Sequence, residues 1–122
     1  MDNTVEVTQR SVALAETMQE GVAHIKKLLQ EGKYEQTVSL LDDIVQGFAS
    51  VSASINQIKD DIDTENIRVA EANLRNGFDA IVTAYERKNY GQAQEIIQFT
   101  LQPKLKAWHD AMEDSFKSYL IS

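Results

Sequence analysis

The sequence predicts an all-α protein in which four helices run up, down, up and down as one bundle. Apolar side chains recur every three or four residues in four successive stretches, which is the period of helices that each bury one face. No stretch shows the alternation of a strand, and five glycines and one proline are few for a turn-rich β fold. The 122 residues suffice for one domain with a core, residues 1–122, and not for two.

The first helix is expected from about Thr4 to Glu31. Its apolar stripe steps by four, four, three and four residues along one face and consists of Leu14, Met18, Val22, Ile25 and Leu29. Gly32 follows, and glycine is the residue best suited to the left-handed position just beyond a helix.

The second helix is expected to begin at about Tyr34 and has the clearest periodicity in the chain. Its apolar face consists of Tyr34, Val38, Leu41, Val45, Phe48, Val51, Ile55 and Ile58. Neither glycine nor proline lies between Gly47 and Gly77, so one continuous helix through the middle is an alternative. The acidic and capping residues at 59–65 instead favour a turn near residue 60.

The third helix is expected from about Thr64 to Lys88. Its inward-facing residues are Ile67, Ala70, Leu74, Phe78, Ile81 and Tyr85. Asn89 then caps the next helix, with Gln92 three residues later completing a pair that resembles a capping box.

The fourth helix is expected from Tyr90 towards Tyr119. Its apolar face consists of Ile97, Leu101, Leu105, Trp108, Met112 and Phe116. Pro103 lies inside this stretch, lacks a backbone N–H and clashes with the carbonyl group of Phe99. We therefore expect the helix to bend or break at Pro103.

The chain partly matches itself at an offset of 56 residues. The identities place Gly21, Ile25, Tyr34, Gln36 and Gln46 on Gly77, Ile81, Tyr90, Gln92 and Gln102. Val45 falls on Leu101 and Gly47 falls on Pro103. The match indicates two related helical hairpins, 1–60 and 61–122; the alternative is that amphipathic hairpins share this pattern by necessity. Gly21 and Gly77 lie inside helices, where we expect neighbouring helices to approach closely.

The net charge of −7, from 12 basic and 19 acidic residues, argues against nucleic acid and against an anionic membrane surface as partners. No apolar stretch approaches the roughly 18 to 20 residues of a membrane helix, and the first ten residues do not have the pattern of a signal peptide. There is no cysteine, so thiol chemistry is excluded. We expect a cytoplasmic protein.

Few residues are available for catalysis. A di-iron bundle site needs glutamate three residues before histidine. The residues at that position are Gly21 for His24 and Lys106 for His109. His109 and Glu113 are one turn apart and could hold a metal weakly; a solvated polar face is the alternative. No glycine-rich phosphate loop or nucleophile elbow is present. We predict no catalytic, cofactor-binding or metal-binding residues, and hence no enzyme.

An apolar, aromatic stripe lies near the C-terminus and consists of Trp108, Met112, Phe116, Tyr119 and Leu120. The stripe either closes the core or projects beyond the bundle. An exposed face of this composition is typical of a helix-in-groove contact. We assign these five residues as the candidate partner-binding site.

Three resemblances bear on function. The run Ala23 to Lys27 resembles the phosphorylation segment of histidine phosphotransfer domains, which implies phosphate on His24; Lys27 and Leu28 stand where those domains have the glycine that lets a response regulator approach. A second set of residues resembles the C-terminal signature of small uncharacterised helical proteins of Gram-positive bacteria. This set consists of Asn89, Tyr90, Ile96, Ile97, Leu101, Pro103, Leu105 and Trp108. The stretch from Leu28 to Phe48 resembles the central hairpin of flagellar export chaperones.

These observations lead to one leading hypothesis and two alternatives. The leading hypothesis is a non-enzymatic adaptor or export chaperone of bacterial origin, which binds a protein partner along an apolar groove or through the C-terminal stripe. A helical flagellar or secreted client is the partner that the resemblances imply. The alternatives are a signalling bundle of the histidine-phosphotransfer type and a self-assembling structural protein that forms a homodimer.

Overall fold

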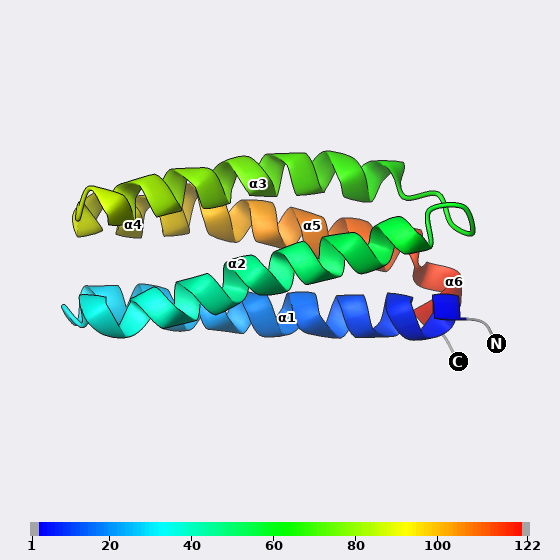
Figure 1. The fold of residues 1–122 in the computed structure, drawn as a ribbon, viewed down its shortest axis with the longest axis horizontal. Helices are drawn as coiled ribbons and strands as arrows, with labels where there is room; N and C mark the ends of the chain where they lie inside the picture. Colours follow the sequence, from blue (N-terminus) through cyan, green and yellow to red (C-terminus); the bar gives the residue numbers. More distant parts are fainter. Residues whose placement is uncertain (1–2, 121–122) are drawn as a thin grey trace.

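A computed structural model describes residues 3–120 and confirms the all-α helical bundle (Figure 1). The elements are α1 (Asn3–Gln30), α2 (Tyr34–Gln57), α3 (Glu65–Glu86), α4 (Tyr90–Ile96), the π-helical turn η1 (Ile97–Leu101), α5 (Gln102–Ser115) and α6 (Lys117–Leu120). Consecutive long helices are antiparallel, and α4, η1 and α5 together form the fourth one. Among residues 3–120, no helix combines the length and apolar character needed to cross a bilayer.

The turn after α1 is closed by Gly32, as predicted. Gly32 has φ +76°, a left-handed conformation in which glycine has no Cβ to clash. The Lys33 N–H donates to the Leu28 carbonyl at 2.9 Å, and the Gly32 N–H donates to the Leu29 carbonyl at 3.1 Å. These two bonds form a Schellman motif, which satisfies carbonyl groups at the end of the helix.

The turn after α3 repeats this geometry with a lysine in the left-handed position. Lys88 has φ 55°, and the Asn89 N–H donates to the Ala84 carbonyl at 2.9 Å. Asn89 then caps α4, because its side-chain oxygen accepts from the Gln92 N–H at 3.1 Å. The predicted cap is therefore confirmed.

A loop at 58–64 separates α2 from α3. The single continuous helix considered as an alternative is therefore wrong, and the turn predicted near residue 60 is confirmed. Acidic and short polar side chains in this loop favour the start of a helix over its continuation.

The helices pack mainly in pairs. The α2 helix packs on α1, the α3 helix packs on α5, and α1 and α5 join the two hairpins along the centre of the bundle. The backbones of α2 and α3 are not closely packed. Figure 1 shows α2 inclined to the other long helices.

The core agrees with most of the predicted stripes. Phe48 belongs to this core, with its ring centroid 5.2 Å from that of Phe78 and 5.1 Å from that of Trp108. Three residues expected in the core are instead exposed: Leu14 by 40%, Tyr34 by 37% and Val38 by 53%. Their positions on the helix period are correct, but neighbouring helices leave that edge of the stripe partly uncovered.

The fourth helix continues through the expected break at Pro103. The residues before it form a π turn, in which the Gln102 N–H donates to the Ile97 carbonyl, five residues back. Pro103 lies in the first turn of α5, where its missing N–H removes little. The wider turn thus accommodates the proline without interrupting the helix.

The two hairpins bury equivalent positions. At an offset of 56, the paired buried residues are Met18 and Leu74, Val22 and Phe78, Ile25 and Ile81, and Leu41 and Ile97. From Leu101 onward the offset is 57, and the pairs are Ile44 and Leu101, Phe48 and Leu105, Val51 and Trp108, and Ile55 and Met112. The predicted pairings of Val45 with Leu101, Gln46 with Gln102 and Gly47 with Pro103 are therefore each corrected by one residue. The π turn absorbs the extra residue and keeps the core in register.

The close approaches expected at Gly21 and Gly77 are confirmed. A Cβ on Gly21 would lie 3.0 Å from Ile44 Cδ1, and a Cβ on Gly77 would lie 3.4 Å from Leu101 Cδ1. Ile44 and Leu101 are themselves equivalent, so the helices of each hairpin meet in the same way.

Candidate binding groove

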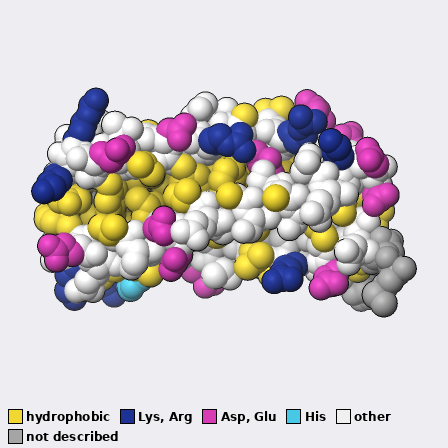
Figure 2. All heavy atoms as spheres, viewed as in Figure 1, with side chains coloured by type: hydrophobic (Ala, Val, Ile, Leu, Met, Phe, Trp, Pro, Cys, Tyr) yellow, Lys and Arg dark blue, Asp and Glu magenta, His cyan; other side chains and the backbone are white. Residues whose placement is uncertain are grey.

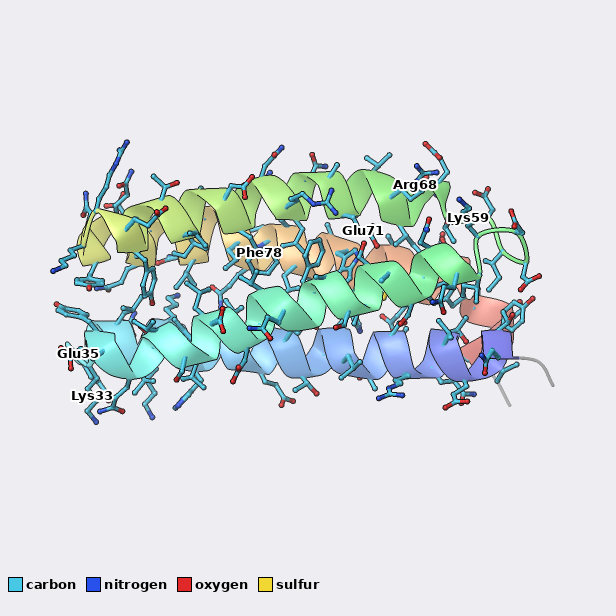
Figure 3. The ribbon with its side chains drawn as sticks, in the orientation of Figure 1. Lys33, Glu35, Lys59, Arg68, Glu71 and Phe78 are labelled. Carbon is cyan, nitrogen blue, oxygen red and sulfur yellow. The ribbon has the colours of Figure 1, made fainter. Side chains whose placement is uncertain are left out.

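A groove runs between α2 and α3 and contains a pocket of about 480 Å³. Its α2 wall carries only small or uncharged side chains, including Ala49, Ser52, Ala53 and Asn56. Its α3 wall carries Arg68, Glu71, Arg75 and Asp79, and Phe48 and Phe78 lie at its base. Figure 3 shows Glu71 and Phe78 projecting from α3 towards α2.

The groove continues as an apolar surface beyond the pocket. Figure 2 shows hydrophobic side chains gathered between α2 and α3, over the half of the bundle that ends at the turn containing Gly32. Val38 and Val82 are exposed by 53% and 39%. Each lies seven residues from a residue of the pocket, Val45 and Arg75, and therefore on the same helix face. The exposed apolar surface thus spans several turns of both helices.

At the end of the groove near Tyr34 and Tyr85, contacts between α2, α3 and α4 close the apolar surface. The hydroxyl groups of Thr37 and Tyr85 are 2.6 Å apart. The Tyr90 ring stacks on Tyr34 and meets the edge of Tyr85, with a centroid distance of 5.8 Å in the second contact. The groove is therefore bounded at one end by tyrosines and at the other by the 58–64 loop.

Glu71 is the one buried carboxylate among residues 3–120, with 8% of its surface exposed. Ser52 Oγ donates to Glu71 Oε2 at 3.0 Å, but Glu71 Oε1 and the Trp108 indole N–H are buried without a well-formed hydrogen bond. Burial raises the pKa of Glu71. The hydrogen-bond donors of Ser52 and Trp108 and the positive charges of Arg75 and Arg68 lower it, but burial has the larger effect. A charged side chain held on a buried helix face in this way is costly for folding.

The pseudo-repeat gives a structural reason for the open groove. The contact of α2 with α3 is equivalent to that of α5 with α1, which is closely packed. The residue equivalent to Glu71 at offset 56 is Ala15, which is fully buried. The small methyl side chain of Ala15 allows α1 and α5 to pack closely against each other. The larger side chain of Glu71 lies between α3 and α2.

The structure places the predicted C-terminal stripe mostly in the core. Trp108, Met112 and Phe116 are each 0% exposed, while Tyr119 and Leu120 are half-buried. The stripe therefore closes the core rather than projecting from the bundle. A surface contact with a partner would require the first three side chains to leave that core.

The two histidines lie outside the groove. His24 is exposed on α1. His109 is buried, with Nε2 3.1 Å from Glu16 Oε2 and Nδ1 3.5 Å from Glu113 Oε1. His109 Nδ1 also lies 3.5 Å from Asp110 Oδ1, and one ligand atom from each of Glu16, His109 and Glu113 lies within 4.8 Å of the others. These three side chains form a candidate cation site in which the two carboxylates are exposed.

Comparison with known families places the chain in one of them. The family model described as "Domain of unknown function (DUF8042)" matches residues 6–111. The chain belongs to this family. No curated protein matches, and no solved structure matches. The matched span contains every residue of the groove walls, whereas four residues of the C-terminal stripe lie beyond it.

Sequence reasoning anticipated an apolar groove as one possible surface but did not locate it. Two signals were visible. Glu71 interrupts the apolar stripe formed by Ile67, Leu74 and Phe78, and no charged residue occurs from Gln46 to Gln57 in α2. Together these two signals indicate a buried charge on α3 and an uncharged face on α2.

Proposed function

We propose that this protein is a non-enzymatic helical adaptor or export chaperone that binds a helical segment of a protein partner in the groove between α2 and α3. The observation that carries the proposal is the groove itself, an open channel with an aromatic base and exposed apolar residues along both walls. Amphipathic helices bind such grooves by inserting residues of their apolar face. We assign the partner to the groove rather than to the C-terminal stripe, because three of the five stripe residues are fully buried.

The dimensions suit a helix. The α2 helix has 24 residues and is therefore about 36 Å long at 1.5 Å per residue. The small side chains of Ala49, Ser52 and Ala53 leave room for close approach of a partner backbone. Phe48 and Phe78 offer an apolar base for one or two anchoring side chains.

The test uses two exposed alanines that differ in position only. Ala53→Glu places a longer, charged side chain in the groove, whereas Ala13→Glu makes the same change on an exposed part of α1 away from the groove. Circular dichroism and thermal unfolding establish that both variants are folded. Affinity capture from the native host, followed by mass spectrometry and purification of the captured client, then identifies the partner.

A bacterial, cytoplasmic client that is helical and either flagellar or secreted would fit the export-chaperone form of the proposal. We expect wild type and Ala13→Glu to retain the client and Ala53→Glu to lose it. Retention by all three proteins would remove the groove from the proposal.

A second copy of the chain is the alternative occupant. Light scattering separates the two, because a dimer formed through the groove has twice the mass of the 13.7 kDa chain and Ala53→Glu would return it to one chain. The adaptor proposal expects a single-chain mass for wild type without its client.

A further inference from the structure

Two arginines line the groove without a direct ion pair. Arg68 and Arg75 are exposed on α3, and neither forms an ion pair with another residue of the described range 3–120. They lie seven residues apart on one helix face, or about 10.5 Å along the axis.

Arg75 is held in the groove rather than against the acids of its own helix. Its guanidinium carbon lies 5.7 Å from the centroid of the Phe48 ring on α2, a cation–π contact across the groove. Glu71 and Asp79 are each four residues away on α3, but neither is ion-paired with Arg75. The guanidinium therefore presents its remaining N–H donors to whatever occupies the groove.

The facing wall supplies no counter-charge. The α2 segment from Gln46 to Gln57 has no charged residue. Between the two arginines lies Glu71, which is buried; its Oε2 accepts from Ser52, and its Oε1 has no well-formed hydrogen bond. Glu65 precedes Arg68 by three residues and lines a surface pocket together with Arg68 and Arg75, also without an ion pair. The α2 wall therefore offers no carboxylate to either guanidinium, and an acidic occupant would supply one on that side.

We propose that the occupant of the groove is an amphipathic helix whose apolar stripe is flanked by two acidic residues seven apart, which pair with Arg68 and Arg75. This inference rests on the proposed function, because it defines the chemistry of the partner that the groove takes. The same seven-residue spacing on both helices puts each carboxylate opposite one guanidinium when the helices lie side by side. Guanidinium and carboxylate groups then make bidentate, charge-assisted hydrogen bonds.

A display library of 18-residue helical peptides tests the inference with full-length protein as the target. The peptides carry a fixed leucine stripe, and the positions that flank the stripe vary among Glu, Gln and Lys. Binders that also bind the Ala53→Glu variant are discarded, so that only groove-dependent peptides are sequenced. We expect Glu to be enriched at two flanking positions seven apart.

The selected peptides are then titrated into arginine variants. Arg75→Gln and Arg68→Gln should each weaken binding by about threefold to tenfold, in line with one partly exposed ion pair. Arg87→Gln makes the same change at the exposed end of α3 outside the groove and should leave binding unchanged. Added salt should weaken binding to wild type more than to Arg75→Gln.

The outcomes separate the inference from the function on which it rests. Groove-dependent peptides with Lys enriched, or with no charge preference, would overturn the acidic partner while the adaptor function stands. Enrichment of Lys would point instead to recognition through Glu71. A library from which no peptide distinguishes wild type from Ala53→Glu would overturn the proposed function itself.

Discussion

Tyr34 and Tyr90 stack face to face at one end of the bundle, with their ring centroids 4.3 Å apart and their planes inclined by 9°. They are the same residue of the two hairpins, 56 positions apart, and each is the first residue of its helix. A contact between equivalent residues places them beside the pseudo-twofold axis that relates the hairpins. The stack therefore joins the start of α2 to the start of α4, at the closed end of the groove.

This stack predicts an energetic coupling between the two rings. In a double-mutant cycle, Tyr34→Ala and Tyr90→Ala should show an interaction free energy of about 0.5–1.5 kcal/mol, because a stacked pair contributes beyond its buried area. Urea unfolding of the wild type, both single variants and the double variant measures it. Additive effects, equal within about 0.3 kcal/mol, would show that the stack contributes nothing.

The two left-handed turn residues predict opposite responses to substitution. Gly32→Ala adds a Cβ at φ +76° and should lower the free energy of unfolding by about 1 kcal/mol. Lys88→Gly relieves the same strain at φ 55° and should raise it by up to about 1 kcal/mol. Chemical denaturation at fixed pH compares them. If both variants change stability in the same direction, strain at φ is not the governing factor.

Glu71 predicts a pH-dependent gain from a neutral replacement. Because burial raises its pKa in the folded protein above the ordinary value of 4.5, the charged form is disfavoured on folding. This penalty is absent below pH 4.5 and grows as the pH rises through the raised folded value. Glu71→Gln should therefore unfold at a higher temperature than wild type at neutral pH, and the difference should shrink as the pH falls towards 4.5.

Thermal unfolding at a series of pH values checks the sign. Glu113→Gln is the control, because Glu113 is exposed and lies outside the groove. A difference between Glu71→Gln and wild type that stays constant with pH would exclude charge burial as its cause.

The π turn predicts tolerance of one particular deletion. The equivalent core positions are Leu41 and Ile44 in the first hairpin and Ile97 and Leu101 in the second. The second pair is separated by one residue more than the first. Deleting Pro103 should let the segment form a regular α-helix with the core residues from Leu105 onward back in register, and should change the melting temperature by only about 5 °C. Circular dichroism during heating measures it.

A deletion in the regular helix α2 is the matched comparison. Removing the exposed residue Gln46 rotates the following core residues, among them Phe48 and Val51, by about 100°. This loss of burial should prevent stable folding. Equal damage from both deletions would mean that the π turn does not hold a surplus residue.

The sequence was sufficient for the helices and their ends, because these depend on local chemistry. Gly32 and Asn89 act as predicted, and the loop at 58–64 separates α2 from α3. Periodicity alone could not say which edge of a stripe a neighbouring helix covers. Leu14 and Val38 therefore lie on correctly predicted stripes and yet are exposed.

The binding surface was less accessible to sequence reasoning because it depends on how helices pack. Trp108, Met112 and Phe116 have the composition of a docking face, but short loops and a continuous fourth helix place them in the core. The groove depends on the difference between Ala15 and Glu71 at equivalent places in two helix contacts. That difference has a meaning only once the hairpins are superimposed in three dimensions.

The most direct test of the account is the affinity of the purified client for three forms of the protein, measured by isothermal titration calorimetry. Wild type and Ala13→Glu should bind the client equally, and Ala53→Glu should bind it at least about tenfold more weakly, a loss of about 1.4 kcal/mol. Equal affinities for all three proteins would contradict the claim that the groove between α2 and α3 is the binding site.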